Sequence, residues 1–544
     1  MAEQVVIDLE GERQALDRAR RAVDDKLARL ARISGGGADA VADEYIDAVV
    51  AGAIDKLQHE LVVFGRIDDE QPWRVGLYGI DEGGEQLVVD WRARFAEAFY
   101  QAGFDDPRGL ARRVSYVGSI DDLMIEEFTT GEVSGSSPLM AELSRSRGPS
   151  MKAAVATLQA EQDRLVRLDP TARLVLRGGP GTGKTVVGLH RAAWLVYNDR
   201  RVTAERILVV GPSDRFLKFV AAVLPTLGEA RITQTTFERL LGPPSEPGSD
   251  ERWLDVLDRF EATLCRPADL KVGHRRLYEP DVAEIMARSR QRDLPWRDRR
   301  KIFVATVAAR LDVPGRLVSD AAVKVWPRVT ARQAMAKLRS RTTLDQLGAD
   351  ADFVEAWLAS DRQVGDGALN DEVRARFEGV PARYGHVIVD EAQDLTVLQL
   401  RAVIRRSDGV TLVGDDAQRR RASGIGLRRA ASLLDTGLEQ MATAYRMSAE
   451  IADWLNQWAV EHGIDAVELV GIRPTGVAVG RAPQSAGAER DLRQRRQNVA
   501  VITAADVWVH KGIEYDGVVV VTAGMTPAEV YLAASRAAHE LILV

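Results

Sequence analysis

The sequence predicts an α/β protein in which a parallel sheet is interrupted by a helical insertion and preceded by a separate helical and α+β region. Two observations predict the sheet. A short apolar run, a glycine-rich loop and a helical pattern follow one another in residues 172–198, and strand patterns return at residue 384 after a long helical stretch. A leucine heptad near the start predicts the N-terminal helices. We divide the chain into four regions: an N-terminal region (residues 1–150), a sheet region made of residues 151–237 with 381–440, the helical insertion between them (residues 238–380) and a C-terminal region (residues 441–544).

The N-terminal region begins with apolar residues seven positions apart, namely Leu9, Leu16, Val23 and Leu30. This spacing predicts a helix over residues 3–33 that is roughly 45 Å long. The SGGG break at residues 34–37 and a second helical pattern over residues 38–61 predict an antiparallel helical hairpin of the coiled-coil type. An ordinary helical pair packed on a globular body is the alternative.

Strand patterns follow the predicted hairpin. Residues 61–128 contain short apolar runs, two of them separated by a glycine turn, and predict a small α+β module. Residues 134–149 are rich in Ser, Gly and Pro and are interpreted as a linker.

The glycine-rich loop has the spacing G-x-x-x-x-G-K-[ST], which is typical of phosphate binding; a simple glycine-rich turn is the alternative. Its backbone N–H groups can face inward, and the positive end of the following helix adds to this anion site. Lys184 is expected to reach the β- and γ-phosphates of a nucleotide, and the Thr185 hydroxyl to bind Mg²⁺. The residues expected to bind the nucleotide here are Gly178, Gly179, Pro180, Gly181, Thr182, Gly183, Lys184 and Thr185.

Two acidic residues end the strand that returns after the insertion. Nucleotide hydrolysis needs Mg²⁺ on the phosphates, a group that activates water, and positive charge near the γ-phosphate. We expect Asp390 to hold the metal through water and Glu391 to activate the attacking water; a solvated turn is the alternative. Gln418 ends the next predicted strand and could sense the γ-phosphate. Arg446 and Arg536 are candidates for the cationic clamp.

The predicted insertion contains a basic stretch over residues 288–301. Its arginines alternate with Asp293 and Asp298, so a solvated helix face is favoured over a nucleic-acid stripe.

The composition gives a formal net charge of −7, so no overall basic field draws the protein to duplex nucleic acid. The single cysteine, Cys265, excludes an internal disulfide and fits a reducing compartment. The sequence contains no leader pattern and no run of about 18 apolar residues. We therefore expect a soluble, cytoplasmic protein that does not bind membranes.

Six motifs occur in order along residues 155–544, namely GGPGTGKT, VDEAQD, GDDAQ, YR, KGIEYDG and ASRA. Together they resemble the UvrD/Rep-type core of superfamily 1 helicases. The resemblance implies two RecA-like P-loop NTPase lobes, with ATP and Mg²⁺ as ligands. It implies that Gln162 and Tyr445 bind the adenine and that Glu514 lies near the sugar. It also implies that Arg446 and Arg536 contact the γ-phosphate.

A closer resemblance is to HelD-like ATPases, which recycle RNA polymerase in bacteria. It rests on the N-terminal hairpin, on FGRID, on LYGID followed by VVDWRARFAEAFY, on TLQAEQDRLVR, on the core motifs and on WPRVTARQAMAKL in the insertion. The resemblance implies that the partner is bacterial RNA polymerase core. It implies that the hairpin enters the secondary channel, that the insertion reaches toward the main channel, and that ATP turnover is linked to release of polymerase from nucleic acid.

The sequence departs from strand-separating relatives in two places. Too few residues separate Gln418 from Gly512 for a large extra domain, and Arg419, Arg420 and Arg421 stand where many translocases have a base-stacking aromatic residue. Direct DNA binding is therefore expected to be weak or absent. Two alternatives stay open: a single-stranded DNA translocase or helicase, and a polymerase-associated nucleotide-binding module whose shortened second lobe impairs hydrolysis.

Overall fold

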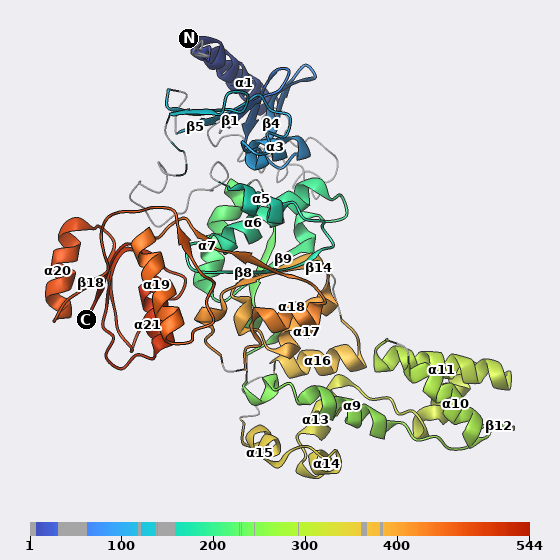
Figure 1. The fold of residues 1–544 in the computed structure, drawn as a ribbon. Helices are drawn as coiled ribbons and strands as arrows, with labels where there is room; N and C mark the ends of the chain where they lie inside the picture. The colour runs from blue at the N-terminus through green and yellow to red at the C-terminus, as the bar shows by residue number, and fades with distance from the viewer. Residues whose placement is uncertain are drawn as a thin grey trace.

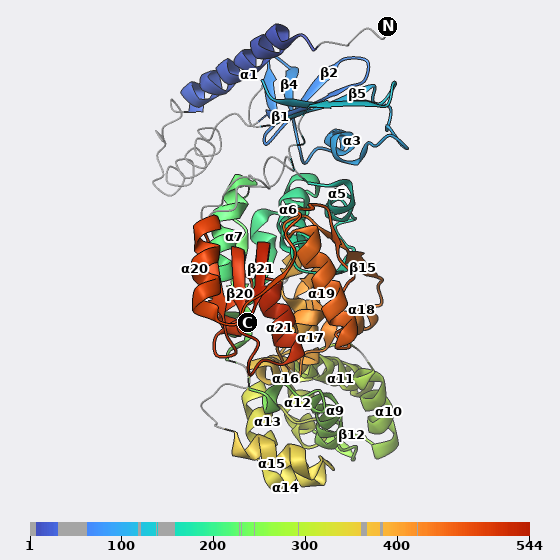
Figure 2. The ribbon, with the colours of Figure 1, turned by 60° about the vertical axis from the view of Figure 1, so that its left-hand side comes forward.

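The computed structural model describes residues 7–30, 63–117, 121–135, 137, 139, 158–360, 367–380 and 384–544, apart from residues 228, 230, 244, 292 and 422. In Figure 1 a central lobe has an N-terminal module above it, a helical insertion below it and a second lobe at its side. Figure 2 gives the same order from another side. The N-terminal module and the insertion therefore lie at opposite ends of the central lobe.

The N-terminal module contains a seven-stranded, mostly antiparallel sheet in the order β3-β4-β2-β1-β5-β6-β7. Gly83 and Gly84 join β3 to β4 with φ angles of 59° and 90°, a conformation that favours glycine. The elements are β1 (Val63–Asp68), β2 (Pro72–Gly76), β3 (Ile80–Glu82), β4 (Glu85–Asp90), η1 (Arg94–Ala96), α3 (Glu97–Gln101), β5 (Arg112–Tyr116), β6 (Leu123–Glu127) and β7 (Glu132–Gly135).

The predicted strands of this module correspond to β1 to β6 and are confirmed. The apolar run that begins at Trp73 forms two strands, because β2 ends at Gly76 and β3 begins at Ile80. The last strand, β7, pairs with β6 and includes Ser134 and Gly135. The interpretation of residues 134–149 as a linker is therefore wrong for its first two residues, because pairing with a neighbouring strand overrides their turn-like composition.

Helix α1 (Leu9–Leu30) packs on this sheet. Ala19, Ala22 and Val23 contact Ile80 and Val88 in a small apolar cluster. Leu9, the first residue of the heptad, is 36% exposed. Part of the apolar face of α1 therefore packs on the sheet of its own module. The predicted second helix of the hairpin, residues 38–61, lies outside the described residues.

Glu12 fastens α1 to the sheet. Its carboxylate is 2% exposed and accepts hydrogen bonds from Arg74 Nε at 2.7 Å, Arg66 Nη1 at 2.9 Å and Tyr116 Oη at 2.5 Å. Burial alone would raise the pKa of Glu12, but the hydrogen bonds from Arg74 and Tyr116 lower it overall. Arg66, the arginine of FGRID, therefore serves the packing of the module.

The central lobe is built on a six-stranded parallel sheet in the order β10-β9-β13-β14-β8-β15. Alternate strand residues face two apolar clusters: Leu174 packs with α6 on one side, and Val175 packs with α17 and α18 on the other. The elements are α5 (Ala160–Val166), β8 (Arg173–Gly178), α6 (Lys184–Asn198), η3 (Ala204–Arg206), β9 (Ile207–Gly211), α7 (Asp214–Thr226), β10 (Thr233–Thr236), β13 (Tyr384–Val389), η6 (Ala392–Asp394), α17 (Val397–Arg406), β14 (Ser407–Gly414), η7 (Asp416–Gln418), α18 (Gly426–Leu434) and β15 (Leu438–Met441).

The DWRA stretch joins the N-terminal module to the central lobe. The Arg92 guanidinium is held by Asp90 and reaches Glu229 Oε1 at 2.9 Å. Arg167, which follows α5, donates to the Trp91 carbonyl at 2.9 Å and the Ala93 carbonyl at 3.1 Å. These contacts are inside the protein, so the stretch that motivates a polymerase-binding expectation is not a free partner surface.

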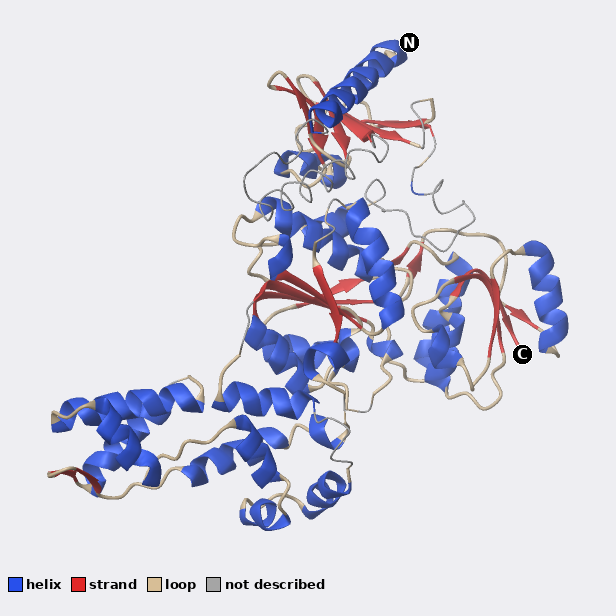
Figure 3. Cartoon of the chain, turned by 180° about the vertical axis from the view of Figure 1, so that it is seen from behind, coloured by secondary structure: helices blue, strands red, loops and turns tan. Residues whose placement is uncertain are grey.

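The insertion between β10 and β13 is almost entirely helical, with one short hairpin, β11–β12, at its tip (Figure 3). Its own apolar core includes Trp253, Trp296, Trp326 and Trp357. The elements are α8 (Phe237–Leu241), η4 (Pro247–Ser249), α9 (Trp253–Leu264), β11 (Leu270–Val272), β12 (Arg275–Leu277), α10 (Glu279–Arg290), α11 (Trp296–Leu311), α12 (Gly315–Ala321), η5 (Ala322–Lys324), α13 (Ala331–Leu338), α14 (Arg341–Gln346), α15 (Ala351–Ala359) and α16 (Gly367–Phe377).

The basic stretch of the insertion is only partly a solvated face. Arg288 and Lys301 have exposed side chains. Arg300, however, is buried and donates to the Trp326 carbonyl at 2.9 Å, and Arg299 donates to Glu261 at 2.5 Å. Two of these charges therefore belong to the core of the insertion.

A second buried ion-pair network joins the insertion to the central lobe. Glu372 on α16 is fully buried and accepts hydrogen bonds from Arg376 at 2.9 Å and from Arg401 on α17 at 3.0 Å. Asp371 is bound by Arg405 and Arg406 of α17. The helix that follows the predicted catalytic acids is thus attached to the base of the insertion.

The second lobe has a four-stranded parallel sheet in the order β18-β21-β20-β19 and a separate strand pair, β16–β17. No helix in the described part of the chain is long and apolar enough to cross a membrane. The elements are β16 (Thr443–Ala444), α19 (Ala449–Glu461), β17 (Val470–Gly471), β18 (Gly480–Arg481), α20 (Ser485–Arg495), β19 (Val499–Ile502), η8 (Val507–His510), β20 (Tyr515–Val520), α21 (Pro527–Ala534) and β21 (Ala537–Leu543).

Replacing Glu12 by Ala should loosen α1 from its sheet. Removing one partner of a buried ion-pair network costs about 3–5 kcal/mol, because Arg74, Arg66 and Tyr116 each lose this hydrogen-bond acceptor in a largely buried place. Amide protons of residues 9–30 should then exchange with deuterium about 10² to 10³ times faster. Glu10→Ala, at an exposed position in the same turn, should leave exchange unchanged; equal effects of the two variants would contradict the anchoring role of Glu12.

Candidate nucleotide-binding site

The glycine-rich loop lies where sequence reasoning expects it, between the end of β8 and the start of α6. Gly181 and Gly183 have φ angles of 72° and 87°. Lys184 Nζ donates to the Gly179 carbonyl at 2.7 Å, as does the Thr182 hydroxyl at 2.8 Å. The loop therefore curls over its own lysine at the N-terminus of α6, which is a favourable place for phosphate oxygens.

The acid predicted to hold the metal lies against this loop. Thr185 Oγ1 donates to Asp390 Oδ2 at 2.7 Å. Burial, and next the charge of Glu391, raise the pKa of Asp390 to about 6. A hydroxyl beside a buried carboxylate fits Mg²⁺, which prefers oxygen ligands and commonly takes one or two from the protein and the rest from phosphates and water. Thr185 and Asp390 are the residues that would hold it.

Glu391 directly follows this acid and has a left-handed backbone, with φ 55°. Its Oε2 accepts from Gln393 Nε2 at 2.6 Å and lies 3.0 Å from Lys511 Nζ. Burial alone would raise the pKa of Glu391, but the positive charges of Lys511 and Lys184 lower it overall. The carboxylate is thereby kept ionised, as a group that accepts a proton from water must be.

Gln418 and Arg536 meet in the structure. Gln418 Nε2 donates to Asp415 Oδ2 at 2.6 Å, and Gln418 Oε1 accepts from Arg536 Nη2 at 2.9 Å. Arg536 directly precedes β21 in the second lobe and is 5% exposed. The predicted γ-phosphate sensor of one lobe is thus bound directly to a predicted clamp arginine of the other.

The remaining second-lobe residues approach the loop from β16 and its neighbours. The Tyr445 N–H donates to the Gly181 carbonyl at 3.1 Å. Arg446 Nη1 donates to Glu514 Oε2 at 2.9 Å. Gly179 packs so closely on Leu469 that a Cβ at this glycine would lie 2.3 Å from the leucine Cδ2. A larger residue at this loop position would have to displace the Leu469 side chain, because the second lobe covers the loop here.

Gln162 lies on α5 with both ends of its amide bonded to the protein. Its Nε2 donates to the Thr182 carbonyl at 3.1 Å, and its Oε1 accepts from the Gln159 N–H at 3.1 Å. The side chain therefore joins α5 to the glycine-rich loop. Its role toward adenine, like the roles of Tyr445, Arg446 and Glu514, stays a prediction.

Sequence reasoning missed three residues of this site. Lys511 is the lysine of KGIEYDG, Gln393 stands in VDEAQD, and Asp415 is the first acid of GDDAQ. Each lies inside a motif that was singled out for another residue. Asp415 could be predicted, because it is a polar residue directly after a parallel strand. Lys511 could not, because its contacts depend on how the two lobes meet.

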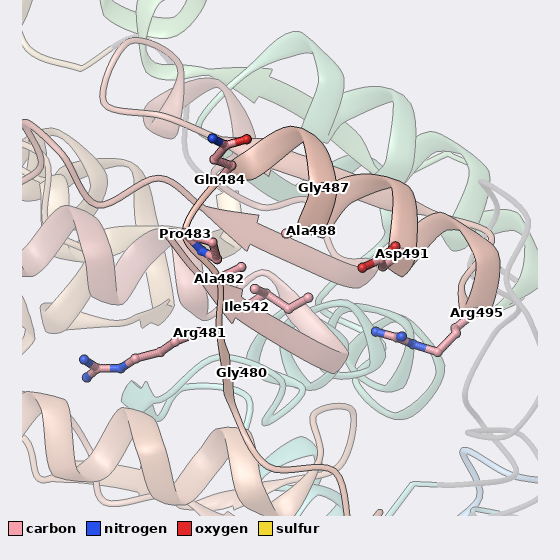
Figure 4. A pocket seen from close by; sticks show the side chains of 10 residues that line it. All are labelled: Gly480, Arg481, Ala482, Pro483, Gln484, Gly487, Ala488, Asp491, Arg495 and Ile542. Carbon is pink, nitrogen blue, oxygen red and sulfur yellow. The ribbon is translucent and has the colours of Figure 1, made fainter.

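One pocket of the described chain lies away from this site. It has a volume of about 370 Å³ and is lined by residues of β18 and α20 and by Ile542 of β21, with Arg481, Asp491 and Arg495 among them (Figure 4). None of the predicted nucleotide-binding residues lines it. The pocket is therefore separate from the glycine-rich loop.

Two family models match the chain. A model described as "DNA helicase IV HelD, N-terminal domain" matches residues 4–123, and one described as "AAA domain" matches residues 162–422. These two matches together support a HelD-like protein of the superfamily 1 helicase family. With its P-loop, it is a helicase-like NTPase with a two-lobe P-loop fold. The HelD-like assignment and the predicted fold class are confirmed.

Comparison with solved structures gave helicases of low similarity. A complex of arterivirus nonstructural protein 10 (helicase) with DNA is 12% identical with a TM-score of 0.31, and covers 70% of this chain and 63% of its own. The arterivirus helicase crystal structure (18% identity, TM-score 0.23) covers 31% of this chain and 41% of its own. The chain thus spans less than two thirds of these structures. A comparison with curated proteins gave no match.

Replacing Glu391 by Gln should remove the group that accepts a proton from water. We expect the turnover number for ATP to fall about 10²- to 10⁴-fold, which is the usual contribution of general base catalysis. Nucleotide affinity, measured by equilibrium titration with a fluorescent ATP analogue, should change little. Glu205→Gln, at an exposed position of the same lobe, is the matched control; equal turnover of wild type and Glu391→Gln would favour a binding module without hydrolysis.

Proposed function

We propose that this HelD-like NTPase hydrolyses ATP to act on bacterial RNA polymerase core and promotes release of the polymerase from nucleic acid. The observation that carries the proposal is the match of residues 4–123 to the N-terminal domain of HelD. We further propose that the N-terminal helices and the insertion bind polymerase, in the cytoplasm. Their positions at opposite ends of the central lobe (Figure 2) would let them reach separate regions of a large partner.

In this proposal ATP binds at the glycine-rich loop. Water attacks the γ-phosphorus and gives a proton to Glu391 while the bond to the β–γ bridging oxygen breaks, leaving ADP and phosphate. Lys184, Arg446 and Arg536 offset the charge of the transferred phosphoryl group. Bound Mg²⁺ would neutralise charge on the phosphates.

The contacts between α5 and the N-terminal module support a mechanical link. Asp163, next to Gln162 on α5, is bonded to Arg167 Nε at 2.8 Å and to Gln101 Nε2 of α3 at 2.8 Å. Arg167 in turn holds the carbonyls of the DWRA stretch. A shift of α5 on nucleotide binding would therefore act directly on the module that is proposed to bind polymerase.

A single-stranded DNA translocase is less well supported. The backbone N–H groups of Arg420 and Arg421 donate to Asp394 Oδ1 at 2.7 and 3.2 Å, so this segment is bound to the central lobe. The segment offers no aromatic ring on which a base can stack.

Purified protein should co-migrate with RNA polymerase core on a sizing column at micromolar concentration. Arg20→Glu/Arg21→Glu, on α1, should weaken the complex at least tenfold, because charge reversal at an interface replaces attraction by repulsion. Arg490→Glu/Arg493→Glu, an equal charge change on exposed α20, is the control. Absence of co-migration with both proteins folded would exclude the proposal.

Single-stranded DNA should leave the rate of ATP hydrolysis unchanged within about twofold, because the expected stacking contacts are missing. The measurement is the steady-state ATPase rate with increasing oligonucleotide at low salt, where phosphate contacts are strongest. Stimulation of tenfold or more would favour the translocase over the polymerase-release factor.

A further inference from the structure

Lys511 crosses from the second lobe to the catalytic acids of the first. It directly follows η8 and is largely buried, with its side chain 14% exposed. Its ammonium nitrogen lies 3.0 Å from Glu391 Oε2, 3.1 Å from Asp394 Oδ2 and 3.0 Å from the Gln418 carbonyl oxygen. All three partners belong to the central lobe, so this side chain is a bridge between the lobes.

The surroundings of Glu391 explain why a cation is placed there. Asp390 precedes it and Asp415 ends the neighbouring strand, so buried negative charges gather at this edge of the sheet. The charged groups that face Glu391 are Lys184 on the glycine-rich loop, Lys511 beside η8, Arg536 directly before β21, Asp390 and Asp415. Of the three cations, Lys511 makes the direct ion pair.

We propose that Lys511 is a positioning residue for ATP hydrolysis, through which the second lobe holds the Glu391 carboxylate in place for the attacking water. Two groups bind the Oε2 atom of this carboxylate and so restrict its rotation, namely Gln393 within the first lobe and Lys511 from the second. Lys511 also donates a hydrogen bond to the backbone carbonyl of Gln418. The side chain of Gln418 in turn accepts a hydrogen bond from Arg536. One lysine thus connects the group that activates water to the residues at the other side of the site.

This arrangement makes hydrolysis depend on contact between the lobes. Separation of the lobes would withdraw Lys511 from Glu391 and Arg536 from Gln418 in the same movement, because both cations come from the second lobe. A mechanical load on the second lobe would then slow the chemical step while ATP stays bound to the glycine-rich loop. The inference rests on the proposed role of Glu391 as the group that accepts the proton from water.

The test compares Lys511→Met, which keeps the length of the side chain and removes its charge, with Lys511→Arg and the exposed control Lys218→Met on α7. We expect Lys511→Met to lower kcat about 10²-fold, since small misplacement of a reacting group has effects of that size. The dissociation constant of the fluorescent ATP analogue should stay within about twofold of wild type, because Lys511 is proposed to act on the hydrolysis step and not on nucleotide binding. Lys511→Arg should restore at least a tenth of the wild-type kcat, and Lys218→Met all of it.

Three outcomes would overturn the inference: unchanged kcat in Lys511→Met, increased kcat, or a parallel loss of nucleotide affinity. The first means that the ion pair has no role in turnover, the second that it inhibits, and the third that it is structural. Glu391→Gln separates this inference from the role on which it rests. If Glu391→Gln is inactive and Lys511→Met is fully active, the positioning role fails and the role of Glu391 stands.

Discussion

The nucleotide site depends on the balance of charge at the carboxyl ends of β13 and β14. Asp390 and Asp415 are buried there, and the partly buried Glu391 lies beside them. Like charges in such a place repel by several kcal/mol unless cations offset them. Lys184 comes from the loop that binds phosphate, whereas Lys511 and Arg536 come from the second lobe. The charge balance of the site therefore requires both lobes, and Mg²⁺ would add to it.

Ion pairs between oppositely charged side chains also join the modules to one another. Arg66 and Arg74 hold α1 through Glu12, Arg92 holds the N-terminal module through Glu229, and the arginines of α17 hold the insertion through α16. Buried ion pairs add little net stability, because desolvation offsets their attraction, but loss of one partner is costly. Their effect here is to fix the orientation of the modules relative to the central lobe.

The sequence predicts the parts of this structure that depend on local pattern. Two parts of the site follow apolar strands, namely the loop of Gly178 to Thr185 and the acids Asp390 and Glu391. Because the carboxyl ends of parallel strands meet at one edge of a sheet, the sequence predicts that these two parts lie together. The roles of FGRID and DWRA were not predictable, because their partners are far away in the chain. Lys511 was missed for the same reason: nothing near it in the sequence indicates that it contacts Glu391.

Three residues expected to touch the nucleotide already have protein partners. Gln162 is bonded to the loop, Arg446 to Glu514 and Arg536 to Gln418. A nucleotide that binds them must replace these contacts with its own, so its binding free energy is the difference between two sets of hydrogen bonds. A ligand shifts a conformational equilibrium only by its differential affinity for the two states. Because Arg446 and Arg536 belong to the second lobe, each such exchange couples nucleotide binding to the position of that lobe.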